Sequence, residues 1–351
     1  MKKLAWILFL SGLLLPLAGC TINPRLLSSV QPQDSSSSWP GQSSEASSSG
    51  TSQTSASSSQ PGAASDTSGG GYIQRSRPTD EGFVPHNYGG VITYGFDPQT
   101  VVTDGNLIRA LDRLDGSHYL QNGSCEYGGK YYYREGATPY SADCYFANSE
   151  WIEPNKPYWF VCEPIRWIVL GEYDEGYLCL SENVLEQWIF GNFYDGYSNG
   201  HYANAWQDSA LQDFLNDKFI FNAFILSNPD SFLWEVTNDN SPASTEDSNN
   251  EPNGDTTYDR GFALCYQDFC NYNFAFSNDD PFKRHAPASD YAMARGVEYA
   301  NNAGGFYWTR SPSLGGYKEA WAIDENGYFR STYIEDAHVG VRPAIYLKRF
   351  G

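Results

Sequence analysis

The chain has 351 residues, a formal net charge of −20 at pH 7, and a composition that is 40% hydrophobic, 16% aromatic and 18% charged. This acidic balance excludes nucleic acid as an expected partner, because neutralising phosphates requires clustered Lys and Arg. A surface so poor in charge must rely on Tyr, Asn, Ser and Gly, a composition typical of extracellular binding and cell-wall proteins.

The first 19 residues predict a lipoprotein signal peptide. Lys2 and Lys3 precede an apolar segment, residues 4–15, that is too short to span a membrane comfortably. The next residues resemble the bacterial lipoprotein signal, in which cleavage before a Cys exposes it for lipidation: Leu17-Ala18-Gly19-Cys20. We therefore expect a lipid on Cys20 to anchor the protein at the extracytoplasmic face of a bacterial cell membrane. The alternative is an ordinary secretory signal in which Cys20 is incidental.

A Ser-rich segment separates this signal from the rest of the chain. Residues 28–71 contain Ser with Gly, Thr and Gln and show no apolar periodicity, so they cannot bury a core. We expect residues 20–71 to be a lipidated Cys with a flexible tether, and a Gly/Ser-type coil of this length spans roughly 35–40 Å. Residues 72–351 are then expected to form a single globular domain.

The first half of that domain predicts two helices and three strands. A strand at 94–102 leads into a helix that Thr103 or Asp104 can cap, and a hairpin is expected from 157–170 and 177–181. Apolar residues of the first helix recur at i, i+3, i+4 and i+7: Leu107, Ala110, Leu111 and Leu114. A second helix, capped by Asp208 or Ser209, buries a stripe of six side chains: Trp206, Ala210, Leu211, Phe214, Leu215 and Phe219.

A polar, acidic insertion follows at residues 227–258. Its density of hard oxygen ligands can hold Ca²⁺, with Asp239, Asp247 and Asp255 as candidate ligands. The insertion lacks the fixed spacing of an EF-hand loop, so a solvated loop is the favoured alternative, and no other cofactor is expected.

The C-terminal part predicts a short helix and successive antiparallel strands. A strand at 261–266 and a helix at 289–296, ended by Gly296, come first. Short apolar and aromatic runs then fill residues 306–347, separated by Gly, Asn, Asp and Ser. The Asn326-Gly327 pair between two of these runs is a strong hairpin signal.

Seven short motifs in order resemble a family of uncharacterised exported bacterial domains. They run from Tyr94 to Leu347 and include Glu163-Pro164-Ile165-Arg166-Trp167, Trp308-x-Arg310-Ser311-Pro312 and Gly340-Val341-Arg342-Pro343-Ala344. The resemblance implies no established activity. The last two motifs are also similar, more distantly, to the formylglycine-generating-enzyme group. This similarity implies an α+β, C-type-lectin-like fold, with small twisted antiparallel sheets, flanking helices and long loops.

The six cysteines after Cys20 are candidates for disulfides in an exported protein. The first choice is Cys125 with Cys144, followed by Cys162 with Cys179 across the hairpin and by Cys265 with Cys270. The formylglycine-generating enzymes hold copper with two cysteines at the spacing of this last pair. In those enzymes the cysteine pair follows the segment that corresponds to the Trp308 motif, whereas here Cys265 and Cys270 precede that motif. An ordinary disulfide or two buried thiols are therefore favoured over a copper site.

No catalytic residue stands out. The chain lacks a G-x-S-x-G segment, its five His residues show no metal spacing, and no acidic pair is marked by its context. Candidate ligand-binding residues are aromatic, because rings stack on sugar faces: Trp188, Phe193, Tyr194 and Tyr197. Arg310 can grip a carboxylate or sugar acid, although pairing with a buried acid such as Asp290 is the favoured reading.

These features predict a lipid-anchored surface protein whose domain is a non-catalytic binding or adhesion module. A carbohydrate or a surface glycoprotein is the expected partner, in addition to the membrane. The alternatives are a cell-envelope enzyme, either a copper-type oxidase or a hydrolase, and a purely structural component of the envelope.

Overall fold

The computed structural model describes ten segments of the chain: residues 72–74, 89–173, 176–192, 197–198, 201–240, 254–271, 275–276, 280–300, 304–313 and 317–349. The chain divides into two units, Met1–Ser65 and Asp66–Gly351, and every described residue belongs to the second. The predicted signal peptide, Cys20 and the tether therefore lie outside the described residues. In the part that is described, no helix is both long enough and apolar enough to cross a membrane.

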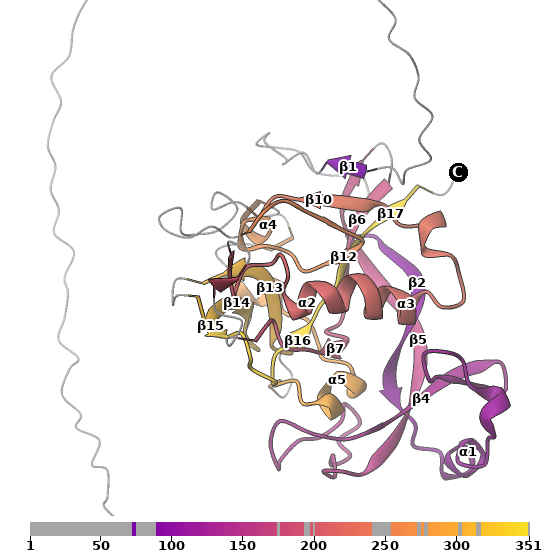
Figure 1. Cartoon of the computed structure of the whole chain (residues 1–351). Coiled ribbons are helices and arrows are strands. Elements are labelled where there is room, and N and C mark those ends of the chain that lie inside the picture. The colour runs from indigo at the N-terminus through magenta and orange to yellow at the C-terminus, as the bar shows by residue number, and fades with distance from the viewer. Residues whose placement is uncertain are drawn as a thin grey trace, which may run out of the picture. The chain divides into compact units, whose positions relative to one another are not determined.

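A long strand, β5 (Pro157–Tyr173), is the centre of a seven-stranded sheet (Figure 1). One edge of β5 pairs with β2 (Val91–Val101), and the other edge pairs first with β4 and then with β6. The remaining strands extend the sheet on both sides: β3 (Cys125–Tyr127), β4 (Lys130–Gly136), β6 (Gly176–Ser181), β12 (Gly261–Phe262) and β17 (Ala344–Lys348). The predicted hairpin of residues 157–170 and 177–181 is confirmed as β5 and β6.

A second, five-stranded sheet is built mainly from the C-terminal part of the chain. Its strands are β7 (Glu186–Gln187), β13 (Tyr307–Pro312), β14 (Glu319–Ile323), β15 (Phe329–Tyr333) and β16 (Gly340–Val341). The predicted Asn326-Gly327 hairpin is confirmed, because β14 and β15 pair from Ile323 opposite Phe329 onward. Gly327 has a φ of +83°, a left-handed conformation that glycine adopts without strain.

Two smaller sheets and the helices complete the described elements. The sheets are β1 (Tyr72–Gln74) with β10 (Glu235–Asn238) and β11 (Thr257–Asp259), and β8 (Tyr197–Ser198) with β9 (His201–Tyr202). The α-helices are α1 (Gly105–Leu111), α2 (Ala210–Asp213), α3 (Ile220–Ala223), α4 (Tyr266–Asn271) and α5 (Asp290–Arg295). The other helical segments are η1 (Gly116–His118), η3 (Phe214–Phe219), η4 (Pro229–Ser231) and η6 (Pro281–Arg284).

The helix starts follow local side-chain chemistry. Asp104 caps α1, Ser209 caps α2 and Ser289 caps α5, each by accepting hydrogen bonds from backbone N–H groups of the first turn. The segments α2, η3 and α3 run on without a break as the predicted second helix. Gly296, with a φ of +108°, ends α5 as predicted.

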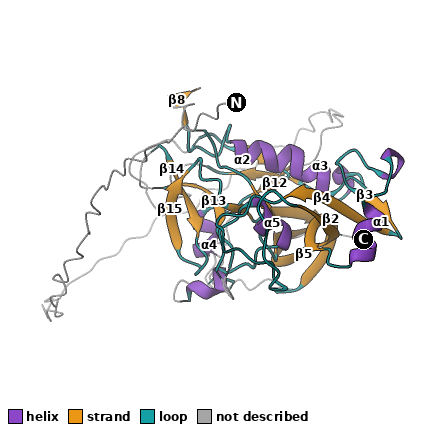
Figure 2. Ribbon diagram, turned by 90° about the horizontal axis from the view of Figure 1, so that it is seen from below, coloured by secondary structure: helices purple, strands orange, loops and turns teal. Residues whose placement is uncertain are grey.

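Helices connect the sheets. Helix α5 contacts both β2 and β7, so it bridges the seven-stranded and five-stranded sheets, while α3 packs against β2 (Figure 2). Strand pairs are antiparallel except for β1 with β10 and β13 with β16. The predicted α+β class is thus confirmed as mixed structure with mostly antiparallel sheets and short helices. The strand predicted at 261–266 is shorter than expected, because the carbonyl of Leu264 already accepts a hydrogen bond from Arg310 of the other sheet.

No disulfide joins the six described cysteines, so the predicted pairings are wrong for this structure. Cys125 and Cys144 lie in two separate apolar clusters. Cys179 pairs with Val169, and Cys162 lies seven residues earlier on β5, which at about 3.3 Å per strand residue is roughly 23 Å away. Cys265 precedes α4 and its Sγ accepts a hydrogen bond from the N–H of Asp268, whereas Cys270 lies near the other end of that helix.

Candidate ligand-binding site

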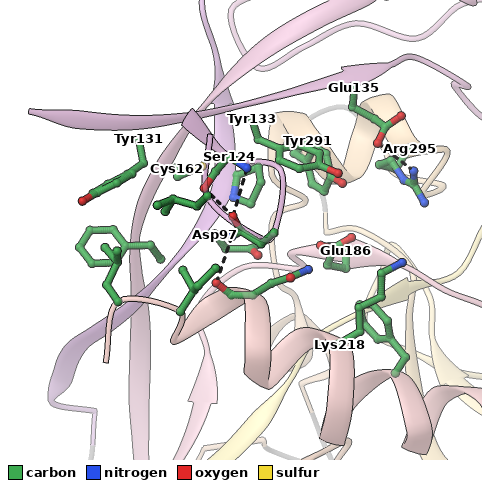
Figure 3. Close-up of a pocket in the computed structure, with 18 of the residues that line it drawn as sticks. Asp97, Ser124, Tyr131, Tyr133, Glu135, Cys162, Glu186, Lys218, Tyr291 and Arg295 are labelled. Atoms are coloured by element: carbon green, nitrogen blue, oxygen red, sulfur yellow. Dashed lines mark hydrogen bonds and ion pairs between the residues drawn. The ribbon is translucent and has the colours of Figure 1, made fainter. Parts of the chain in front are cut away.

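A cavity of about 110 Å³ lies where the two sheets and two helical segments meet (Figure 3). Strands β2, β4, β5 and β7 contribute to its lining, together with α5 and the helix that contains η3. Its polar and ionisable lining includes Asp97, Tyr133, Glu135, Cys162, Glu186, Lys218, Tyr291 and Arg295. The cavity therefore gathers acids and bases from segments almost 200 residues apart in the sequence.

Asp97 enters the cavity because of the two-residue period of β2. Gly95, Asp97, Gln99 and Val101 are buried, and the residues between them are more exposed. Asp97 thus occupies an inward position where an apolar side chain would be expected, and its residue surface is only 1% exposed. The backbone fixes it firmly, since β2 pairs with β5 on both sides of this position.

The Asp97 carboxyl group is buried, but not all of its hydrogen-bonding capacity is used by the described residues. Its Oδ2 atom has no hydrogen-bond partner among the described residues. Burial, and next the nearby charge of Glu186, raise the pKa of Asp97 well above its ordinary value and favour the protonated form. A protonated carboxyl can both donate and accept hydrogen bonds, which makes Asp97 a versatile contact for a polar ligand.

Glu186 is the second buried carboxyl group of the cavity. It lies on the short strand β7, which is held by pairing with β16 at Val341. Burial raises the pKa of Glu186 to about 7, although the positive charges of Arg295 and Lys218 oppose the shift. Its charge therefore changes close to physiological pH.

Two cations face the acids from the helices. Arg295, the last residue of α5, forms an ion pair with Glu135 of β4 at 3.3 Å between Nη1 and Oε2. Its Nε atom is buried and has no hydrogen-bond partner among the described residues. Lys218 of η3 places its Nζ 4.8 Å from the ring centroid of Trp188, in cation–π geometry.

Aromatic rings form part of the cavity lining. Trp188 stacks on Phe214, with ring centroids 4.4 Å apart and ring planes at 17°, and its Nε1 donates to the carbonyl of Ala210. Tyr133 and Tyr291 meet edge to face at 5.8 Å. The structure thus brings one predicted ligand-binding residue, Trp188, to the cavity.

The other predicted binding residues lie elsewhere. Phe193 and Tyr194 are outside the described residues, and of Tyr197 only the backbone in β8 is described. Arg310 does not line the cavity. It is 5% exposed and pairs with Asp268 at 2.8 Å, so the acid beside it is Asp268 and not Asp290. Asp290 instead accepts hydrogen bonds from two backbone N–H groups.

Two of the three predicted Ca²⁺ ligands lie in the described part of the chain. Asp239 and Asp255 are exposed, and Asp247 lies outside the described residues. Within the described segments, no group of three or more His, Cys, Asp or Glu side chains could hold a metal ion. Calcium binding by the insertion stays a prediction.

Residues 175–349 match a domain of unknown function, DUF6273. No curated protein and no solved structure matches the chain. The expected uncharacterised domain family is thereby confirmed in this coarse form. The DUF6273 match begins at the turn between β5 and β6, so it divides the seven-stranded sheet.

The cavity spans this boundary. Asp97, Tyr133 and Glu135 precede the DUF6273 match, whereas Glu186 and Arg295 lie within it. None of these five residues is among the site residues predicted from the sequence. The inward period of β2 could have revealed Asp97, but a two-residue strand such as β7 carries no periodic signal for Glu186.

Proposed function

We propose that this chain is a surface lipoprotein whose domain, residues 72–351, is a non-catalytic binding module for carbohydrate, free or on a glycoprotein. A lipid on Cys20 would hold it at the extracytoplasmic face of a bacterial membrane, with the Ser-rich segment as tether. The signal-like residues before Cys20 support the anchor. The cavity supports the binding role.

A single observation carries the binding role. A fully buried carboxyl group, Asp97, presents an oxygen without a partner among the described residues to a cavity that aromatic rings help to line. Pockets for small ligands combine apolar walls with a few polar groups that fix orientation. A sugar ring suits this combination, because its apolar faces pack against aromatic walls and its hydroxyl groups exchange hydrogen bonds with a carboxyl group.

A hydrolase is the second candidate, and one observation favours it. Asp97 and Glu186 line the same cavity, and burial raises both of their pKa values. Glycoside hydrolases use two carboxyl groups, one as acid and one as base or nucleophile. Mass spectrometry of oligosaccharides incubated with the protein separates the two roles, since a binding module leaves them intact.

We also propose that the architecture is C-type-lectin-like and distantly related to the formylglycine-generating enzymes. In support, the two motifs behind this resemblance lie side by side, with Tyr307 of β13 opposite Gly340 of β16. The copper-type oxidase reading has less support, because the Sγ of Cys265 already accepts a hydrogen bond from the backbone of Asp268.

A glycan array tests the binding role. The full-length chain, purified in detergent, is screened with Ca²⁺ and again with a chelator, and we expect binding to a defined class of glycan. Trp188→Ala should weaken that binding roughly tenfold or more, because it removes an aromatic part of the cavity lining and releases Phe214 and Lys218 from their contacts with the ring. Trp151→Ala is the matched control, since Trp151 is 46% exposed and does not line the cavity.

Two outcomes would count against this role. Binding that survives Trp188→Ala unchanged would place the site outside the cavity. A full-length chain that binds no glycan in either condition would leave a protein partner or a structural role in the envelope. Loss of binding with the chelator alone would assign Ca²⁺ to the acidic insertion.

A further inference from the structure

The formal charges of the acids and bases that line the cavity do not balance when all of these groups are ionised. Three acids, Asp97, Glu135 and Glu186, face two bases, Lys218 and Arg295. Arg295 is already paired with Glu135, and Lys218 lies over the ring of Trp188. One acid is therefore in excess, and it belongs to the pair formed by Asp97 and Glu186.

Two buried polar atoms of this lining have no hydrogen-bond partner among the described residues. They are Oδ2 of Asp97, which accepts or donates depending on its proton, and Nε of Arg295, which only donates. Such atoms are rare in folded proteins, and each calls for an explanation. A ligand that donates hydrogen bonds to Asp97 and accepts one from Arg295 would satisfy both atoms.

We infer, building on the proposed function, that the sugar bound in this cavity carries a protonated primary amine whose ammonium group lies against Asp97 and Glu186. An ammonium group has three hydrogen-bond donors and no acceptor, so it suits two neighbouring carboxyl oxygens. Its single positive charge also matches the one acid in excess. A ring hydroxyl of the same sugar would accept the hydrogen bond from Arg295.

The ligand class follows from the same chemistry. An N-acetylated sugar replaces the charge by a neutral amide and brings a methyl group against the buried carboxyl groups. A neutral hexose offers hydroxyl groups but no charge to offset the acid. We therefore expect amino sugars to bind more tightly than either.

Binding is coupled to a proton. Burial favours the protonated forms of both acids in the ligand-free protein, and the nearby charge of Glu186 adds to this effect at Asp97. An arriving ammonium favours the carboxylates, so the pair releases protons to solvent as the ion pair forms, and the charges of the lining balance once both acids are ionised. The other titratable and charged groups around the pair are Tyr133 and Glu135 of β4, Cys162 of β5, Lys218 of η3, and Tyr291 and Arg295 of α5.

Isothermal titration calorimetry of the full-length chain in detergent tests this inference. Glucosamine, N-acetylglucosamine, glucose and ethanolamine are compared at about pH 6.5 in two buffers that differ in ionisation enthalpy. Glucosamine should bind roughly tenfold or more tightly than the two uncharged sugars, with a proton released on binding. Asp97→Asn and Glu186→Gln should each reduce this preference, whereas Asp143→Asn, an exposed site outside the cavity, should not.

The outcomes separate the inference from the proposed function. If the three sugars bind equally and no proton is released, the ammonium site is wrong and the carbohydrate module stands. If ethanolamine binds with proton release but no sugar binds, the ammonium site stands and the carbohydrate assignment falls. If none of the four compounds binds, both fall. Unfolding curves of each variant show whether a loss of binding reflects a loss of fold, and Glu186→Gln replaces Asp97→Asn if the latter does not fold.

Discussion

Two buried aspartates on neighbouring parts of the fold have opposite surroundings. Asp259 of β11 is fully buried, and its two carboxylate oxygens accept hydrogen bonds from five side chains: Trp206, Gln212, Asn216, Asn238 and Thr257. Asp97 of β2 is 1% exposed, and its Oδ2 has no partner in the described part of the chain. The same side chain thus stabilises the fold in one place and remains available for a ligand in the other.

The two aspartates are also linked through one helix. The donors to Asp259 include residues of α2 and η3, so the carboxylate ties this helix to β11. The same helix carries Phe214 and Lys218 into the cavity lining. The fully hydrogen-bonded Asp259 therefore fixes the position of a helix that forms one wall of the cavity containing Asp97.

The sharpest test of this difference is to remove each carboxyl group in turn. We expect Asp259→Ala to lower the free energy of unfolding by about 3–5 kcal/mol, because five buried donors lose their acceptor. Asp97→Ala should cost much less, since no hydrogen bond to Oδ2 is lost. Urea denaturation measures both, with Asp143→Ala as exposed control. Equal losses at the two sites would remove the contrast.

A second test asks whether a buried charge outside the cavity is purely structural. Arg310→Met should cost about 3 kcal/mol, because the buried carboxylate of Asp268 loses its ion pair with Arg310. Adding Asp268→Asn should recover part of that loss, as thermal or urea unfolding would show. Binding in the cavity should not change. A loss of ligand affinity at unchanged stability would instead support the ligand role predicted for Arg310 from the sequence.

The sequence predicts the structural elements that depend only on residues close together in the chain. Helix caps such as Ser209, the β5–β6 hairpin and the Asn326-Gly327 turn need only local chemistry, and all three form as expected. The disulfide between Cys162 and Cys179 fails because it requires a register, and the register of β5 with β6 places Cys179 opposite Val169, seven residues from Cys162.

For the same reason, the sequence predicts only some of the residues that line the cavity. The sequence predicts Trp188 as a ligand-binding aromatic residue, and the two-residue period of β2 is enough to place Asp97 inward. Glu186 and Asp97, about 90 residues apart in the sequence, line one cavity because α5 contacts both β2 and β7. No single-sequence pattern carries that information, nor the five donors that gather around Asp259.

The variant Asp97→Asn tests whether the buried carboxyl group, which lacks a hydrogen-bond partner at Oδ2 among the described residues, destabilises the fold. The folded-state pKa of Asp97 is raised, so its contribution to stability is fully present below its ordinary value and is lost as the pH rises above it. We expect Asp97→Asn to match the wild type near pH 4 and to be more stable than the wild type near pH 8. Urea denaturation across this range measures the difference. A variant that is less stable at every pH would assign Asp97 to the fold, like Asp259.

Glu186→Gln gives the smallest effect and the narrowest pH window. The pKa of Glu186 is ordinarily 4.5 and rises to about 7 in the folded protein, so the wild type loses stability as the pH rises between these values and not above them. The variant lacks this titration, and the gap between the two unfolding free energies should widen by on the order of 2 kcal/mol across the window. Combining Glu186→Gln with Asp97→Asn should flatten the profile further, because both buried carboxyl groups have raised pKa values in the folded protein. A gap that stays constant with pH would mean that Glu186 is already charged in the folded state. In that case only Asp97 would hold a proton for an arriving cation to displace.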